Sequence, residues 1–423
     1  MSKIQLIKAR EILDSRGNPT VQTTVVLDSN EKASAAVPSG ASVGKHETIE
    51  LRDGDPQRFN GLGVLKVINN IHQIIAPKLI GYDPTKQKEI DQLMVGLDGT
   101  DNKGKLGANA ILSVSLAVCR TAALVNNLSL YRYINQLAKE AGMEIEIKKI
   151  PQPTLNIING GAHGAGNLDF QEFQILPASN KSYSEGLRMG AEIYHALKKV
   201  LIHRGAVHSI GDEGGFAPNL YTNLDALEAI KQAIESTPYK LGFDVFLGLD
   251  IAPAHFKKGK KYQIRDKSNP LNTTEYIDFL MDLNSQYKLL LLEDPLDEDD
   301  WSSWKLLTSR INRRTIVIGD DLLVTNPSRL EKAIKEKTCS GILVKLNQVG
   351  SLTETLEVIK IAAKGGFKTN ISHRSGETND DFIADLAVGV QSDFVKFGAP
   401  ARGERLAKYN RLLEIEEELK ELT

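Results

Sequence analysis

The segment TIVIGD, residues 315–320, is an apolar run that ends on a carboxylate, and GILVK, residues 341–345, repeats the pattern with a terminal lysine. Runs of this length that are rich in Val, Ile and Leu are typical of strands buried on both faces of a parallel sheet. Four further runs of this kind end on a polar or charged residue, at Asp250, Glu293, His373 and Lys396. The sequence therefore predicts six strands of one parallel sheet.

The spacing of these runs indicates how the strands are connected. Successive end residues are 23 to 43 residues apart, which leaves room for one helix between each pair of strands. Leu352, Leu356, Ile359 and Ala363 show the matching helical periodicity. Six such units in about 180 residues favour closure into a barrel, with an open, doubly wound sheet as the alternative. In a barrel of this type the active site lies where the strands end.

The first 140 residues follow a different pattern. An alternating stretch at residues 20–27 precedes helical stretches around residues 68–79 and 108–126. Because 423 residues exceed the size of one typical core, we expect two domains. We assign an α+β domain to residues 1–140 and a catalytic barrel to residues 148–423, joined by a short proline-bearing connection.

Composition excludes several classes of function. The net charge is −2 and basic residues are spread along the chain, so no nucleic-acid surface is expected. Apolar runs fall well short of the ~18 residues that span a membrane, and the start resembles no signal peptide. Cys119 and Cys339 lie far apart and predict no disulfide or metal motif. We therefore expect a cytoplasmic protein that binds neither membrane nor nucleic acid directly.

Asp250, Glu293 and Asp320 are three carboxylates at successive strand ends. A single acid in such a place is more often a helix cap or part of a surface ion pair. Three converging carboxylates, however, would repel one another and raise their own pKa values unless a cation compensated. Oxygen ligands suit a hard ion such as Mg²⁺ better than zinc, so the sequence predicts a magnesium site.

Lys345 lies inside an apolar run, where a lysine is unfavourable unless its ammonium group reaches a polar cavity. A structural salt bridge is one interpretation. The other is a catalytic base, because a metal ion and a second lysine, Lys396, would lower the pKa of Lys345.

Further candidates lie in glycine-rich or polar segments. Glu213 belongs to the loop GDEGG (211–215), and His163 follows a pair of glycines, although both segments could be simple turns. Glu172 lies in an alternating strand and could point into the barrel or away from it. The segment SHRSGET (372–378) follows a strand, and we expect it to open a helix that binds a phosphate or carboxylate. The alternative is an ordinary helix cap with a capping-box acid.

Five motifs together resemble the enolase family over residues 10–418. They are AREILDSRGNPT (9–20), LGANAI (106–111), GDEGG (211–215), LEDP (292–295) and SHRSGET (372–378). The resemblance implies a C-terminal eight-stranded α/β barrel of the TIM-like, enolase type, whose first hairpin departs from strict strand–helix order. It also implies an N-terminal α+β capping domain that supplies lid loops.

The resemblance further implies a reaction, the reversible dehydration of 2-phosphoglycerate to phosphoenolpyruvate in glycolysis and gluconeogenesis. Lys345 would be the base and Glu213 the general acid. Asp250, Glu293 and Asp320 would bind a first Mg²⁺, and Ser42 on a lid would reach a second. The substrate pocket would contain His163, Gln171, Glu172, Ser372, His373, Arg374, Ser375 and Lys396. A homodimer or an octamer would be the expected assembly.

Val43, Phe397 and Gly403 depart from the family pattern. They put lid closure and substrate affinity in doubt, and we expect Phe397 to narrow the barrel mouth. Two other functions remain open: a related lyase or racemase that acts on a different acid, and a binding protein without catalysis. Arg374 and Ser375 favour a phosphorylated substrate over the first alternative, and the intact set of candidate catalytic residues argues against the second.

Overall fold

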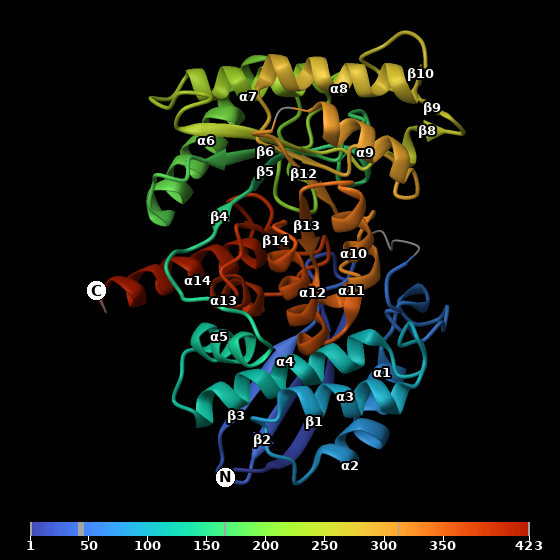
Figure 1. Ribbon diagram of the computed structural model, residues 1–423, viewed down its shortest axis with the longest axis vertical. Coiled ribbons are helices and arrows are strands. Elements are labelled where there is room, and N and C mark those ends of the chain that lie inside the picture. Colours follow the sequence, from blue (N-terminus) through green and yellow to red (C-terminus); the bar gives the residue numbers. More distant parts are fainter. Residues whose placement is uncertain (1, 41–45, 165, 312, 422–423) are drawn as a thin grey trace.

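The computed structural model describes residues 2–40, 46–164, 166–311 and 313–421 (Figure 1). The N-terminal sheet and the helices that cover it gather at one end of the longest axis, and α7 and α8 lie at the other end (Figure 1). A barrel built from the C-terminal part of the chain lies between them.

The N-terminal sheet is antiparallel, with the strand order β1-β2-β3. Its strands are β1 (Ile4–Leu13), β2 (Pro19–Leu27) and β3 (Lys32–Ala36), and β2 is the alternating stretch predicted at residues 20–27. The helices that follow are α1 (Leu65–Asn70), α2 (Ala76–Leu79), α3 (Gln87–Asp98), α4 (Ala108–Val125) and α5 (Leu130–Glu140). A π-helical segment, η2 (Ile71–Ile75), joins α1 to α2, so the predicted helix around residues 68–79 is confirmed as a composite.

Helix α4 is the core helix of this part of the chain. It packs on β2 and β3, and nearly all of its side chains are buried. Its length and apolar composition alone would allow it to cross a membrane, but 83% of that stretch is buried inside the protein. Such burial is the normal environment of a central core helix.

The large sheet closes into a barrel because β4 (Gln152–Pro153) and β5 (Leu155–Asn159) follow each other with only Thr154 between them. β4 pairs with β15 (Phe394–Lys396), and β5 pairs with β6 (Glu172–Pro177). The remaining strands are β7 (Val245–Asp250), β11 (Leu291–Glu293), β12 (Ile316–Gly319), β13 (Gly341–Val344) and β14 (Lys368–Ser372). With β4 and β5 taken as one broken strand, the barrel has eight strands, and the fold class is confirmed.

The six strands expected from the apolar runs are β7 and β11 to β15. Neighbours in this series are parallel, as predicted. β6 pairs antiparallel with both β5 and β7, so the first hairpin departs from strand–helix order. Strand–helix spacing could not detect β5 and β6, because no full helix separates them.

Helices surround the barrel and fill the intervals between its strands (Figure 1). They are α6 (Tyr183–His203), α7 (Asn223–Glu235), α8 (Thr273–Tyr287), α9 (Trp301–Arg310), α10 (Pro327–Glu336), α11 (Leu346–Val349), α12 (Leu352–Lys364), α13 (Phe382–Gly389) and α14 (Gly403–Lys420). Capping boxes fix where three of them begin, at Ser182, Thr222 and Asn272. A small antiparallel sheet, formed by β8 (Lys257–Lys258), β9 (Lys261–Tyr262) and β10 (Leu271–Asn272), lies outside the barrel.

Candidate active site

A polar cavity lies at the end of the barrel where the parallel strands finish. Side chains at the ends of the barrel strands and in the segments next to these ends line it, and most of them are buried. The lining comprises His163, Gln171, Glu172, Glu213, Asp250, Ala252, Asp294, Asp320, Asp321, Lys345, Ser372, His373, Arg374, Ser375 and Lys396. Of the candidates named from the sequence, Glu293 is buried behind this lining. Ser42, like Val43, lies outside the described residues.

Lys396 lies at the centre of a group of carboxylates. Its ammonium nitrogen is 2.9 Å from Asp250 Oδ2, 2.8 Å from Glu293 Oε1 and 3.0 Å from Glu172 Oε1. Burial lowers the pKa of Lys396, but these carboxylates outweigh burial and hold it well above its usual value. Burial and the charge of Asp250 raise the pKa of Glu293 well above its usual value.

Lys345 forms a second ion pair, with Asp320. The ammonium nitrogen of Lys345 contacts Asp320 Oδ2, while Gln348 Nε2 donates to Asp320 Oδ1 at 3.1 Å. Burial lowers the pKa of Lys345, but Asp320 outweighs it and the pKa is raised. The lowering predicted from the sequence depends on the charge of a bound metal ion as well as on Lys396, so it stays a prediction. Lys396 does act in the expected direction, but it has less effect than the carboxylate in direct contact.

The three predicted metal ligands are thus divided between two ammonium groups. A different acidic group is closer together: one carboxylate oxygen each of Asp294, Asp320 and Asp321 lie within 4.8 Å of one another. Asp294 accepts backbone N–H groups of Asp320 at 2.9 Å and of Asp321 at 2.7 Å. Sequence reasoning missed Asp294 and Asp321, although each directly follows a predicted ligand.

The composition of the cavity fits a divalent cation. Six carboxylates but only three lysine or arginine side chains are among its lining residues. Burial, reinforced by Asp320, raises the pKa of Asp321 to about 7. Buried carboxylates that repel one another are stabilised by a cation, and oxygen donors favour a hard one. The site therefore contains acidic groups that could hold a divalent metal ion.

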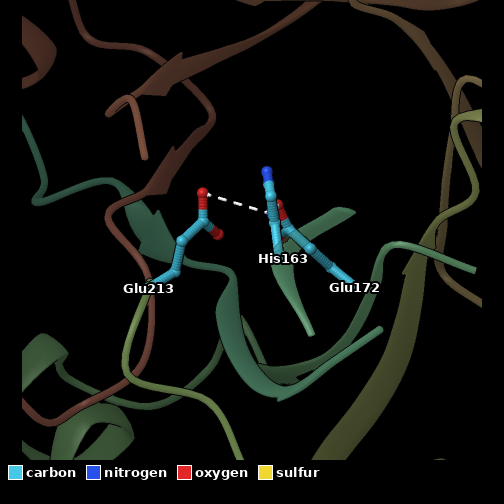
Figure 2. A group of neighbouring side chains, drawn as sticks. All are labelled: His163, Glu172 and Glu213. Atoms are coloured by element: carbon cyan, nitrogen blue, oxygen red, sulfur yellow. Dashed lines mark ion pairs between the residues drawn. The ribbon is translucent and has the colours of Figure 1, made fainter. Parts of the chain in front are cut away.

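Glu213, His163 and Glu172, drawn in Figure 2, form another side of the cavity. His163 Nδ1 lies 3.4 Å from Glu213 Oε1 and 3.8 Å from Glu172 Oε1. Figure 2 shows the side chains of His163 and Glu213 converging from separate segments of the chain. Glu172 points into the barrel, which decides between the two orientations left open by the sequence.

These groups perturb one another's pKa values strongly. Burial raises the pKa of Glu213, but His163 and His373 outweigh it and hold it well below its usual value. Burial raises the pKa of Glu172 to about 8, although Lys396 opposes the shift. Burial also lowers the pKa of His373 to about 3. Glu213 is therefore ionised in this arrangement, whereas His373 is neutral.

The segment 372–378 supplies the cationic end of the cavity. Arg374 Nη1 donates to Glu47 Oε2 at 2.9 Å and to Asn347 Oδ1 at 3.0 Å. Glu377 accepts the backbone N–H groups of Arg374 and Thr378 within the segment itself. The expectation that this segment opens a helix is wrong, because α13 begins only at Phe382. Instead, the segment bridges to the N-terminal part of the chain through Ser39 and Gly376.

Phe397 does not narrow the barrel mouth. Lys396 points into the cavity, so the next side chain along the chain points away from it. Phe397 is fully buried and packs on Tyr409 of α14, with 5.6 Å between the ring centroids. The expectation that Phe397 obstructs the cavity is therefore wrong.

Two family models match the chain. The model described as "Enolase, N-terminal domain" matches residues 4–134, and the model described as "Enolase, C-terminal TIM barrel domain" matches residues 147–423. Together they cover nearly the whole sequence.

Proposed function

The chain belongs to the enolase family, and we propose that this lyase catalyses the reversible dehydration of 2-phosphoglycerate to phosphoenolpyruvate. One observation carries the proposal. Lys345 follows β13, whereas Glu213 is bound to Asn156 on β5, and both line one cavity with two further strands between them. A base and an acid on different sides of one cavity suit an anti elimination, in which the proton and the hydroxyl leave from opposite faces of the substrate.

Lys345 is proposed as the base. It would take the proton from the carbon next to the carboxylate, and the electrons of that C–H bond would form the new double bond. In this arrangement Asp320 keeps the lysine protonated. When the charge of Asp320 is compensated, this interaction weakens and Lys345 can accept a proton.

Glu213 is proposed as the acid. It would give a proton to the β-hydroxyl as the C–O bond breaks, so that the hydroxyl leaves as water and the enol phosphate remains. His163 and His373 keep Glu213 ionised in this arrangement. An anionic substrate beside the carboxylate would oppose that effect, because like charges favour the protonated acid.

Mg²⁺ is the proposed cofactor, with two ions per site. Asp250, Glu293 and Asp320 would hold the first, and Ser42 would contribute to the second. When bound, the ions would supply positive charge that compensates these carboxylates and stabilises the negative charge formed on proton loss.

Arg374 and Ser375 are proposed to bind the phosphate, and Lys396 the carboxylate side of the substrate. Guanidinium groups match phosphate geometry well. Arg374 pairs with Glu47 in this structure, and both side chains are largely buried. A phosphate would therefore compete with Glu47 for the guanidinium group.

Turnover of 2-phosphoglycerate tests the proposal. We expect the ultraviolet absorbance of the enol phosphate to rise when Mg²⁺ is present and to stay flat when EDTA is added. Glycerate, which lacks only the phosphate, is the matched control substrate and should not react. Absence of turnover with 2-phosphoglycerate, together with activity on an unphosphorylated acid, would instead identify a related lyase.

A further inference from the structure

Glu213, the proposed acid, is surrounded by further hydrogen-bonding side chains. Asn156, on β5 and fully buried in the barrel, donates from Nδ2 to Glu213 Oε2 at 3.0 Å. Its carbonyl oxygen has no hydrogen-bond partner among the described residues. The amide is therefore held in the barrel by its contact with Glu213 and not by a wider polar network.

His373 faces the same carboxylate oxygen. Its Nε2 lies 3.5 Å from Glu213 Oε2, which is beyond the usual hydrogen-bond range, and Nε2 has no hydrogen-bond partner among the described residues. Hydrogen bonds of catalytic groups are often long before a substrate binds and shorten in the reacting complex. The contact is useful only if Nε2 carries the proton, so the tautomer of His373 decides its role.

Arg405 on α14 fixes that tautomer. Its Nη1 donates to His373 Nδ1 at 2.7 Å, and an arginine side chain has only donors, so Nδ1 must be the acceptor. The ring is therefore neutral, with its proton on Nε2. Arg405 is completely buried and also donates to the backbone oxygens of Asp212, Arg374 and Ser375, which hold it in place.

We propose that Asn156 and Arg405 are positioning residues for Glu213: Asn156 binds Oε2 directly, and Arg405 holds His373 so that Nε2–H faces the same oxygen. This inference rests on the proposed role of Glu213 as the acid. Because both neighbours of Oε2 are donors, that oxygen has no room for a proton of its own. The transferable proton must reside on Oε1, the oxygen that faces His163 in the cavity.

The first test is Asn156→Leu, which removes the donor with little change in volume. We expect kcat to fall ten- to a hundredfold, about the rate equivalent of one lost hydrogen bond to a charged group. KM should change by less than about threefold, because Asn156 does not line the cavity. An unchanged kcat would overturn the proposed role of Asn156.

Asn370→Leu is the matched control. Asn370 is a buried amide on β14, and neither polar atom of its side chain has a hydrogen-bond partner among the described residues. The same substitution there should leave kcat within about twofold of the parent value. An equal loss of kcat at both positions would show a general effect of the barrel interior and would overturn the inference.

The second test reads the tautomer itself. In full-length protein labelled with ¹⁵N-histidine, the His373 signals, assigned by their loss in His373→Gln, should show Nε2 protonated and Nδ1 unprotonated. In Arg405→Lys, which keeps the charge but loses the planar guanidinium, they should show a mixture of tautomers. A proton on Nδ1 in the parent protein, or an unchanged tautomer in the folded variant, would overturn the role of Arg405.

A failure of the positioning inference can be distinguished from a failure of the proposed function. The ¹⁵N signals do not depend on turnover, so they test the positioning of His373 even if 2-phosphoglycerate is not the substrate. If Arg405→Lys does not fold, the parent tautomer and the comparison of Asn156→Leu with Asn370→Leu still decide the proposal.

Discussion

The two sides of the cavity rest on different layers of the barrel interior. Side chains two positions deeper along a strand face the same way, so a cavity residue at the end of a strand has a neighbour beneath it. Beneath Glu293, Asp320 and Lys345 lie Leu291, Ile318 and Leu343, which belong to one apolar cluster together with Leu176 and Phe394. We call Leu291, Ile318 and Leu343 the aliphatic floor.

Beneath Glu172 and Glu213 lie amides, which we call the amide floor. Gln174 donates to Glu172 and Asn156 donates to Glu213, each at 3.0 Å. The aliphatic floor offers no donor, so charge above it must be balanced by groups in the cavity itself, namely Lys345, Lys396 or a bound cation. The amide floor instead orients its carboxylates from below. Above the aliphatic floor, an ammonium group can be exchanged for a bound metal ion. Above the amide floor, an acid is held in a fixed position.

Lys345→Ala is expected to have the largest effect. Loss of a general base typically lowers the rate by about 10²–10⁴-fold, and we expect a kcat near the upper end of that range. Because Lys345 lies above the aliphatic floor, the substitution removes a charge from the cavity without breaking a hydrogen bond from below. Steady-state kinetics and a thermal melt would measure this. A variant with near-normal kcat would contradict the assignment of the base.

Leu343→Ala should weaken the aliphatic floor itself. Leu343 is completely buried, so the cavity left behind should lower the free energy of unfolding by about 3 kcal/mol. Asn370→Leu should instead raise it by about 1 kcal/mol, because it removes buried polar atoms without partners among the described residues. Chemical denaturation measures both values. A marked loss of stability in Asn370→Leu would show that the amide is held by a buried water or ion.

Asp320→Asn should change how strongly the cavity binds a divalent cation. Removing this charge should weaken Mg²⁺ binding by about ten- to a hundredfold, because ligand charge sets much of the affinity for hard cations. Isothermal titration would measure it. Asn156→Leu on the amide floor is the control and should leave Mg²⁺ affinity nearly unchanged. Equal losses of Mg²⁺ affinity in the two variants would show that the two floors do not differ in their effect on cation binding.

Stability should fall as pH rises from 5 to 8 in protein kept free of divalent ions. Burial raises the folded-state pKa of Glu172 to about 8 and that of Asp321 to about 7, so the folded state holds protons that the unfolded state has released. His373, whose pKa is lowered to about 3, opposes part of this loss, because below about pH 6.5 its unfolded form binds a proton that the folded form does not. We expect a net loss on the order of 4 kcal/mol across this window. The pKa of Glu213 is lowered, so its contribution to stability is fully present throughout this window and is lost only at lower pH.

Denaturation at several pH values measures that slope. Mg²⁺ should reduce the pH dependence of stability, because a cation above the aliphatic floor replaces protons near Asp321. Glu172→Gln should also reduce it, because the residue above the amide floor no longer titrates. A free energy of unfolding that rises between pH 5 and 8 would contradict the raised pKa values of Glu172 and Asp321.

Much of the fold followed from the sequence because its signals are local. The apolar runs predicted β7 and β11 to β15, and the regular intervals predicted a barrel. The missing strands, β5 and β6, form a hairpin without a full intervening helix, so no strand–helix interval marked them. Closure through β4 depends on pairing with β15, about 240 residues later, which periodicity cannot reveal.

The site was predictable to the extent that strand ends reveal it. Its other features depend on distances between remote segments. Asp320 raises the pKa of Lys345 because the two side chains are in direct contact, and the sequence gives no such distance. Arg405 reaches His373 from the C-terminal helix, and Asn156 lies in a strand that the spacing did not mark. Phe397 was misjudged because the side to which it points depends on the register of β15.

Exchange of the C2 hydrogen of 2-phosphoglycerate with deuterium from heavy water tests the central claim most directly, because it reports proton removal separately from loss of water. With Mg²⁺ present, Glu213→Gln should still exchange this hydrogen while forming little phosphoenolpyruvate, since Lys345 remains. Lys345→Ala should do neither. Exchange that persists in Lys345→Ala, or that disappears in Glu213→Gln while Lys345 is intact, would contradict the division of roles between the two sides of the cavity.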